Sequence, residues 1–337
     1  MKYVKDSNSL ERYRIGKKPK EKKNKFLIVY VVIGIIILLV AGALYENMES
    51  RKYLNLGKES NILINKTDYN YKIESTGKYT VIVDGVIGET FLNRQAFMKN
   101  FDNDARVFFY DRPPYDNTEG EEKTPKEIAE DLHFMFRKFG FENKYIVIGE
   151  EYGSLVMEEF INLYPDEVIG AIFINPVGQA LSSPDINEYF SVKNEGTFSN
   201  KTLGIFGIPR LLNNTKVLDY FDTYTFEEEE TKKIYSNIHL SKDHIEAMEK
   251  ETEDLNTFKK TSINEFLLED NPVYLITSEE KEDRFNQDAY LKYSTDSEVV
   301  YVRNSINDVI LSSSYEVNAA LNRLIRKVFI LEKTKGN

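Results

Sequence analysis

Residues 148–153 have the sequence Ile148-Gly149-Glu150-Glu151-Tyr152-Gly153 and lie between an apolar run and a helical pattern. The two glycines keep the spacing of Gly-x-Ser-x-Gly, the pattern of a nucleophile elbow, and Glu151 stands where that pattern has serine. In an elbow a strand turns sharply into a helix, so the central side chain lies beside backbone N–H donors, and the glycines allow a close approach. The sequence therefore predicts the scaffold of an elbow without its nucleophile.

A helix is predicted on either side of this elbow. Before it, Thr124-Pro125-Lys126-Glu127 provides an N-cap hydroxyl, a proline at the first helical position and a glutamate three residues after the cap. After it, Pro165 ends a helix whose apolar residues recur at helical spacing: Met157, Phe160, Ile161 and Tyr164. Ser154 lies in the first turn of this second helix, where we expect a small packing residue rather than a displaced nucleophile.

Short β-rich runs alternate with amphipathic helical stretches from about Asn61 onward. The strand candidates are residues 71–74, 79–84, 106–110, 145–148, 168–174, 273–276 and 299–302. Several of these runs are wholly apolar, as buried parallel strands are. The pattern predicts an α/β fold with a mostly parallel sheet, helices on both faces, and a core formed by residues 61–177 and 269–332.

Residues 178–268 interrupt this alternation. They are polar, rich in charge and helical in pattern, and Thr225-Phe226-Glu227-Glu228 forms another capping-box pattern. We interpret the segment as an inserted helical lid. The acidic run 227–230 is expected to be a solvated helix start, favoured by the helix dipole, rather than a cation site.

The charge of the chain is unevenly divided. Residues 1–25 hold ten Lys/Arg against three Asp/Glu, a net charge of +7, so the remaining residues carry −18 because the total is −11. Residues 26–45 contain the nearly uncharged run FLIVYVVIGIIILLVAGAL, which as one transmembrane helix can cross a bilayer core of about 30 Å. The positive-inside rule places the basic tail in the cytoplasm and the C-terminal domain outside the cell membrane.

The N-terminal apolar run can be read either as a cleaved signal peptide or as a membrane anchor. Ala41-Gly42-Ala43 has the form of a cleavage site and leaves a cleaved signal peptide as an alternative. The length of the apolar run and of the basic segment favours an uncleaved signal-anchor, with membrane lipid as the partner of residues 26–45. Residues 46–60 are expected to form a short stalk or a juxtamembrane helix that holds the domain clear of the membrane.

The composition excludes several kinds of site. There are no cysteines, which excludes disulfides, a thiolate nucleophile and a cysteine-ligated zinc. The histidines, His133, His239 and His244, form no metal-ligand pair, so we expect no metal and no cofactor. His133 is expected far from the elbow, and the two lid histidines are expected on a helix surface. The acidic exterior argues against nucleic acid as a partner.

Several short motifs, taken in order, resemble the α/β-hydrolase fold family, in particular lipase, esterase and peptidase-like members with a lid between the sixth and seventh core strands. Residues 83–88 are similar to the family's His-Gly-x-x-Gly after its third strand, with Asp84 at the histidine. Residues 110–115 are similar to its Tyr-Asp-x-Pro-Gly-Tyr turn after the fourth strand. With the elbow and the strand at 172–177, the resemblance covers about residues 70 to 330.

The resemblance assigns three catalytic positions. Glu151 falls on the nucleophile, where relatives resembling epoxide hydrolases and dehalogenases have an attacking aspartate that still needs a histidine. Asn307 falls on the histidine, and asparagine cannot cycle a proton near neutral pH. The acid is expected after the strand at 273–276, where Asp283 is favoured over three neighbouring carboxylates: Glu279, Glu280 and Glu282.

Under the same resemblance, backbone donors for an oxyanion remain. They are the N–H groups of Tyr152 and of Val86, the residue after Gly85, so a ligand-binding pocket can persist. A carboxylate at Glu151 would compete for these donors and repel a developing negative charge. Glu151 itself is interpreted as a residue stabilised by the helix N-terminus, with ligand binding and catalysis as alternatives.

These observations predict a membrane-anchored, extracytoplasmic pseudoenzyme of hydrolase-like fold that binds a small-molecule ligand or a protein partner. Two alternatives stay open. The first is an active hydrolase of ester-like or amide-like substrates, with Glu151 as nucleophile or base and a lid histidine assisting. The second is a structural protein whose partner is another membrane protein.

Overall fold

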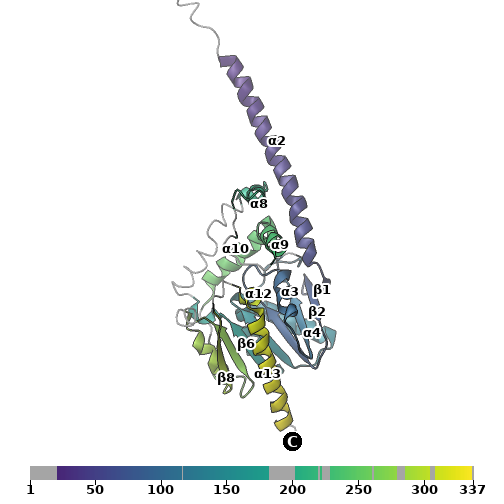
Figure 1. Ribbon diagram of the computed structural model, residues 1–337, viewed down its shortest axis with the longest axis vertical. Helices are drawn as coiled ribbons and strands as arrows, with labels where there is room; N and C mark the ends of the chain where they lie inside the picture. Colours follow the sequence, from purple (N-terminus) through teal and green to yellow (C-terminus); the bar gives the residue numbers. More distant parts are fainter. Residues whose placement is uncertain are drawn as a thin grey trace, which may run out of the picture.

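The computed structural model describes residues 21–115, 117–181, 202–218, 221, 228–259, 262–278, 285–303 and 308–335. Their centre is an eight-stranded sheet in the order β1-β2-β4-β3-β5-β6-β7-β8 (Figure 1). The strands are β1 (Ser60–Ile64), β2 (Thr67–Glu74), β3 (Tyr79–Asp84), β4 (Ala105–Tyr110), β5 (Tyr145–Glu150), β6 (Val168–Ile174), β7 (Val273–Thr277) and β8 (Ser297–Tyr301). The pairs from β4 to β8 are parallel, whereas β2 pairs antiparallel with both β1 and β4. The mostly parallel sheet is confirmed.

Strand β1 was not among the predicted strands. It forms a hairpin with β2 through Asn65 and Lys66, which both have positive φ, +46° and +71°, as a two-residue hairpin turn of type I′ requires. Most of its side chains are exposed, and only Ile64 is fully buried. Its apolar run, Ile62-Leu63-Ile64, has only three residues, so hydrophobic pattern alone does not reveal the strand.

Helices cover both faces of the sheet, as predicted. On one face the core joins alternate strand residues such as Ile82 and Val147 to helices α4 and α5. On the other face their neighbours Val81 and Ile146 pack with helices α3, α12 and α13. Because side chains of a strand alternate between its faces, both apolar sets come from the same runs. The helices are α3 (Phe91–Lys99), α4 (Pro125–Phe139), α5 (Tyr152–Leu163), α12 (Val309–Ser312) and α13 (Ser314–Lys335).

The two helices that flank the elbow begin and end as their sequences predict. The Thr124 hydroxyl accepts the N–H of Glu127 at 3.3 Å, and the Glu127 carboxylate accepts the N–H of Thr124 at 2.9 Å, so the capping box is formed. Gly140, with φ +69°, ends α4. Helix α5 ends at Leu163, two residues before Pro165.

Helix α2 (Glu21–Leu54) is one long helix that projects from the domain (Figure 1). By length and composition it can cross a membrane, since its most apolar window has a mean hydropathy of 3.1 and is not buried against the protein. Its C-terminal end is packed on the domain, because Glu46, Ser50 and Tyr53 are buried. Residues 46–54 thus form the helical alternative of the predicted juxtamembrane segment, and this helix is docked on the domain.

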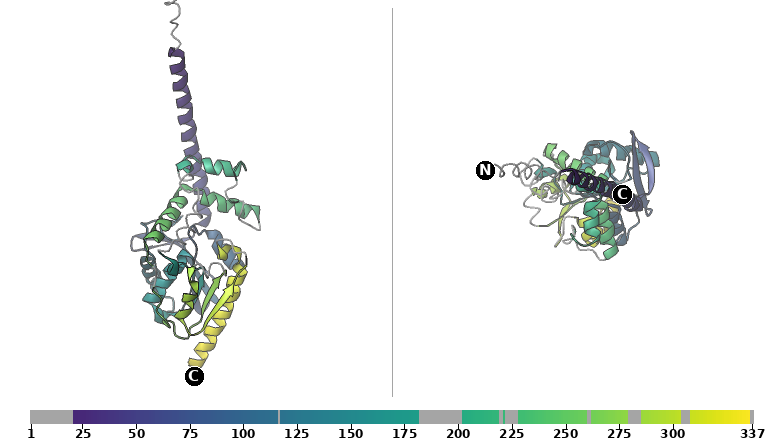
Figure 2. Two further views of the ribbon diagram at one scale, coloured as in Figure 1. Left: turned by 90° about the vertical axis from the view of Figure 1, so that its left-hand side faces the viewer. Right: turned by 90° about the horizontal axis from the view of Figure 1, so that it is seen from above.

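The described part of the insertion lies between β6 and β7 and is helical, as expected of a lid. Its helices lie over one end of the sheet, beside α2 (Figures 1 and 2). They are α8 (Ile208–Asn214), α9 (Glu229–His239) and α10 (Lys242–Thr257). Helix α9 begins after Glu228, and the predicted capping residues 225–227 lie outside the described residues.

Glu332 holds α13 against the sheet, and we expect the loss of its ion pairs to make the protein less stable in acid. Its carboxylate accepts from the Lys144 ammonium at 2.5 Å and the Tyr79 hydroxyl at 2.8 Å, and pairs with Lys78. Although burial opposes the charge, these donors lower the pKa of Glu332 from 4.5 to about 2. The stabilisation is therefore complete above the unfolded value of 4.5 and is lost as the pH falls toward 2. We expect the melting temperature to drop less over this range in Glu332→Gln than in the wild type.

The control for this prediction is Glu298→Gln, which alters a more exposed ion pair between Glu298 and Arg323. This variant should follow the wild-type acid dependence, because exposed pairs contribute little. An equal acid-induced drop in wild type and Glu332→Gln would contradict the assignment.

Candidate functional site

Strand β5 and helix α5 meet at the predicted elbow. Between them Glu151 has φ +47° and ψ −107°, a backbone conformation that residues other than glycine rarely adopt and that is often found at functional sites. A side-chain carbon at Gly149 would lie 2.7 Å from the carbonyl oxygen of Gly153, and one at Gly153 would lie 2.4 Å from that of Asp84. Strand, helix and the end of β3 thus approach so closely that both positions require glycine.

The residue at the centre of the elbow is buried, since the exposed fraction of Glu151 is 1%. Its N–H donates to the carbonyl oxygen of Ile174 at the end of β6, over 3.0 Å. Its own carbonyl oxygen accepts the N–H of Ser154 at 3.1 Å and the Ser154 hydroxyl at 2.5 Å. Ser154 is fully buried and its hydroxyl serves the backbone of the elbow, which supports the packing role predicted for it.

The preceding residue, Glu150, was not singled out by the sequence, yet its carboxylate is fully buried. Its two oxygens accept the N–H groups of Val309 and Ile310, at 2.5 and 3.0 Å, and so cap the N-terminus of α12. Burial raises the pKa of Glu150 well above 4.5, and the nearby carboxylates of Asp308 and Glu151 add to the effect. Glu150 therefore ties the elbow to the chain that follows β8.

The loop after β3, residues 85–90, lies against the elbow. The N–H of Gly153 donates to the carbonyl oxygen of Gly85 at 3.0 Å. The N–H of Gly85 is held by the Glu89 carboxylate at 2.8 Å. One of the loop's donors is thus occupied by a side chain of the same loop, and the resemblance did not point to Glu89.

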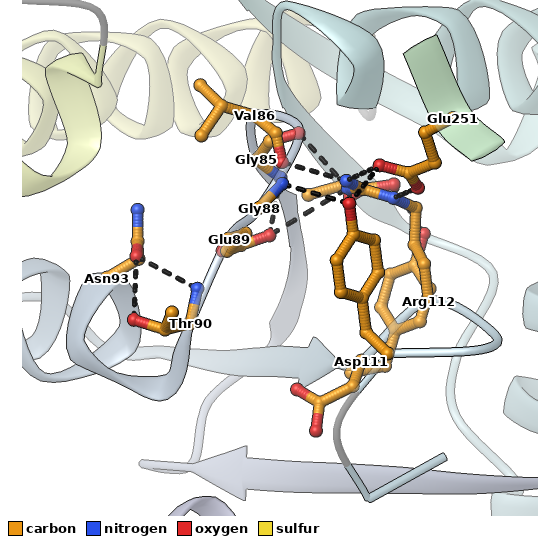
Figure 3. A network of polar contacts seen from close by, with 12 residues as sticks. Gly85, Val86, Gly88, Glu89, Thr90, Asn93, Asp111, Arg112 and Glu251 are labelled. Atoms are coloured by element: carbon orange, nitrogen blue, oxygen red, sulfur yellow. Dashed lines mark hydrogen bonds and ion pairs between the residues drawn. The ribbon is translucent and has the colours of Figure 1, made fainter. Parts of the chain in front are cut away.

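Arg112 is the centre of the polar network in this site (Figure 3). Its guanidinium pairs with Asp84 and donates to the carbonyl oxygens of Gly85 and Val86, at 3.1 and 2.8 Å. It also makes two bonds to the Glu251 carboxylate, Nε to Oε1 at 2.6 Å and Nη2 to Oε2 at 3.0 Å. A two-bond contact of this kind is geometrically specific, so Arg112 fixes the β3 loop and the lid helix α10 together.

Tyr115 provides a second link between the β3 loop and the lid. Its hydroxyl donates to Glu251 Oε2 at 2.8 Å and accepts the N–H of Gly88 at 3.0 Å. Arg112 and Glu251 are 2% and 3% exposed as side chains, so the ion pair is shielded from water. A buried pair of this kind holds α10 over the loop.

The site has more carboxylates than cations among the described residues. Three buried or half-buried carboxylates, those of Asp84, Glu89 and Glu251, pair with the one guanidinium of Arg112. Burial raises the pKa of Glu89 well above 4.5, and that of Glu251 is raised by burial despite Arg112. Such a site disfavours further negative charge, including an oxyanion above the elbow.

The lid histidines lie at this site rather than on an outer helix surface, so that expectation was wrong for His244. His244 is fully buried, and its ring centroid lies 5.2 Å from that of Tyr115 and 4.8 Å from that of His239. His239 stacks on Tyr235, and a side-chain carbon at Gly88 would lie 3.3 Å from its Nε2. Both rings lie at the β3 loop because the lid packs over it. Helical spacing in the sequence does not show which face of a lid helix is covered in this way.

The remaining predicted positions fall into two groups. His133 stacks on Tyr164 at 3.7 Å, beyond the far end of α5, which agrees with the prediction that it is far from the elbow. Asn307, Asp283 and the competing carboxylates at 279, 280 and 282 lie outside the described residues. Among the described residues, no group of three or more His, Asp or Glu has the arrangement of a metal site.

Comparison with known proteins identifies the fold but no near relative. No protein-family model and no curated protein matches the sequence. Solved structures match well: a thermophilic esterase from Thermogutta terrifontis has a TM-score of 0.60 at 15% identity, over 80% of this chain and 99% of its own. The epoxide hydrolase CorEH has a TM-score of 0.57 at 14% identity, over 80% and 98%. At such identities the likeness shows the fold alone.

A third structure matches a larger part of the chain. It is described as a membrane phospholipase A and bacterial virulence factor, with a TM-score of 0.59 at 12% identity over 94% of this chain and 99% of its own. The match leaves out 6% of the 337 residues, which is about 20 residues. Because α2 ends at residue 54, a gap of this size cannot exclude all of α2, so the match includes part of this helix. The resemblance predicted from the motifs is confirmed at the level of architecture: this chain has the α/β-hydrolase fold.

Proposed function

We propose that this protein is a membrane-anchored, extracytoplasmic pseudoenzyme of the α/β-hydrolase fold, which binds a ligand or a protein partner. The observation that carries the proposal is the buried carboxylate of Glu151 at the elbow, where the Gly-x-Ser-x-Gly pattern has serine. Attack on an ester needs a nucleophile here and donors free to receive negative charge. Glu151 and the surrounding carboxylates oppose both requirements.

The contact between loop and lid supports the same proposal. Arg112 and Glu251 close the lid helix α10 onto the β3 loop with two hydrogen bonds in a buried environment. A site held closed in this way is suited to retaining a bound group or to presenting a fixed lid surface. It is less suited to rapid exchange of substrate and product.

The membrane orientation follows from the charge pattern and the length of α2. The net charge of +7 on residues 1–25 favours a cytoplasmic N-terminus, which places the sheet and the lid outside. Two contacts between the end of α2 and the lid support an uncleaved helix. Gly42 lies against Phe206, and Glu46 pairs with Arg210. Cleavage beyond Ala43 would remove the first of these contacts.

Serine-directed fluorophosphonates should not label the purified full-length protein, and short acyl esters should not be hydrolysed above the buffer rate. The physical reason is that position 151, at the centre of the elbow, lacks a hydroxyl and that the Ser154 hydroxyl donates to the backbone of Glu151. Labelling is read by intact-mass spectrometry, with an active serine esterase as the positive control. An adduct on a serine of the site would refute the proposal.

A second candidate, a hydrolase that uses Glu151 directly, is favoured by the position of the lid histidines. His239 and His244 lie beside the β3 loop, where an acid or base could assist. This candidate requires a measurable turnover that Glu151→Gln abolishes while the melting temperature stays nearly constant.

For a protein partner, crosslinking in intact cells should recover a second membrane component, and recovery of the lone chain would count against such a partner.

A further inference from the structure

The lid segment Thr202–Leu218 differs in composition from the rest of the exterior. Residues beyond 25 carry a net charge of −18, yet this segment contains no Asp or Glu, and its charged residues are Arg210 and Lys216. Several of its apolar side chains have exposed fractions between 39% and 66%: Leu203, Ile205, Leu211, Val217 and Leu218. Apolar side chains gathered on one exposed element indicate an interaction surface.

This segment meets helix α2 inside its apolar run. A side-chain carbon at Gly42 would lie 2.4 Å from the carbonyl oxygen of Phe206, so the lid backbone rests on the bare Cα of Gly42. Gly42 precedes Leu44, the last residue of the run, by two residues, which is about 3 Å along a helix. Figures 1 and 2 show α8 beside α2, on the side of the lid that faces away from the sheet. The lid thus reaches the level at which the span leaves the bilayer.

A buried ion pair holds the segment in this place. Arg210 is fully buried and donates to Glu46 of α2 through Nε at 2.7 Å and Nη2 at 2.8 Å. Its remaining donors bond to the carbonyl and side-chain oxygens of Asn237, both at 2.8 Å, and to the Ser241 hydroxyl at 3.1 Å. The pair ties α8, α9 and α10 to the membrane helix. It also removes from the surface the guanidinium that would oppose contact with hydrocarbon.

We propose that Thr202–Leu218 lies in the outer interface of the bilayer that α2 spans, with its exposed apolar side chains against the acyl chains of membrane lipid. The proposal rests on the membrane span of the proposed function but is independent of the loss of catalysis. Membrane lipid is the expected partner of this surface, because the surface adjoins the membrane-spanning run of α2 at Gly42. Lys216, which is exposed, then lies near the lipid headgroups, where a long basic side chain is favoured.

The absence of native cysteines allows a direct test with the full-length chain. Leu211→Cys and Val217→Cys are each labelled with an environment-sensitive nitrobenzoxadiazole fluorophore and placed in vesicles of phosphatidylcholine and phosphatidylglycerol. Lipids that carry a nitroxide near the top of the acyl chain should cause a loss of fluorescence at both positions. Leu38→Cys in the span is the positive control, and Ile330→Cys, an exposed apolar position in the last turns of α13, is the matched negative control. The C-terminal end of α13 lies far from α2 (Figure 1).

The outcomes separate this proposal from the function on which it rests. Quenching at 211 and 217 with none at 330 supports it. If 211 and 217 behave like 330 while 38 is quenched by deep nitroxides, the lid surface is not in the bilayer and the proposal is overturned, although the span stands. If 38 is not quenched, the span itself is absent, and this proposal falls together with the membrane anchoring of the proposed function.

Discussion

Arg112→Ala is expected to lower the free energy of unfolding by about 3 to 5 kcal/mol, the usual cost of removing one partner of a buried ion pair. The change leaves the carboxylates of Asp84 and Glu251 buried without their cation, and it also removes donors from the carbonyl groups of Gly85 and Val86. The measurement is denaturant-induced unfolding of the full-length protein in detergent micelles, followed by circular dichroism.

The matched control for this variant is Arg323→Ala. Arg323 pairs with Glu298 at 3.6 Å, and its side chain is 46% exposed, so its loss should cost no more than about 1 kcal/mol. The double variant Arg112→Ala/Glu251→Ala should lose less stability than the two single variants added together, because the second change removes a carboxylate that the first leaves unpaired. Equal losses in Arg112→Ala and Arg323→Ala would show that the site network does not stabilise the fold.

Gly153→Ala is expected to destabilise the protein by about 1 to 3 kcal/mol, although alanine is the better helix former. The added carbon would lie 2.4 Å from the carbonyl oxygen of Asp84 and 2.9 Å from the Gly85 nitrogen. These neighbours are backbone atoms that cannot rotate away, so α5 and the end of β3 must separate. The melting temperature of the full-length variant measures the effect.

Gly204→Ala provides the comparison, since no atom lies within 4 Å of the carbon that it adds. Its melting temperature should stay close to that of the wild type. If Gly153→Ala were as stable as Gly204→Ala, the close approach of α5 to β3 would be incorrect, and with it the placement of the elbow against the β3 loop.

The elbow and the capped helix α4 were predictable because both depend on neighbours in the chain. The glycine spacing around Glu151 reflects a local steric requirement, and the Thr124 and Glu127 cap is formed within four residues. The apolar runs of the central strands were equally readable, because burial on both faces leaves no polar alternation. The apolar run of β1 has only three residues, Ile62 to Ile64, which is too short to predict a strand.

The polar network of the site was not predictable in the same way. Arg112 lies within the turn motif at residues 110–115. Its partner Glu251 is 139 residues away, in a lid helix that no motif marks. No pattern in the sequence predicts a role for Glu150, although its carboxylate caps a helix 159 residues later. His244 looked like a surface residue, since helical spacing does not say which face another element will cover.

Residue types and their spacing were enough to predict the apolar span, the alternation of strands and helices, and the replacement of serine by Glu151 at the elbow. Each follows from residue type and spacing over a few turns of chain, where sterics and hydrophobic burial act locally. The folded chain was needed to see that Arg112 pairs with Glu251, that the lid histidines lie at the β3 loop, and that Arg210 joins the lid to α2 through Glu46. These contacts join distant segments, and their energies depend on the burial that folding creates.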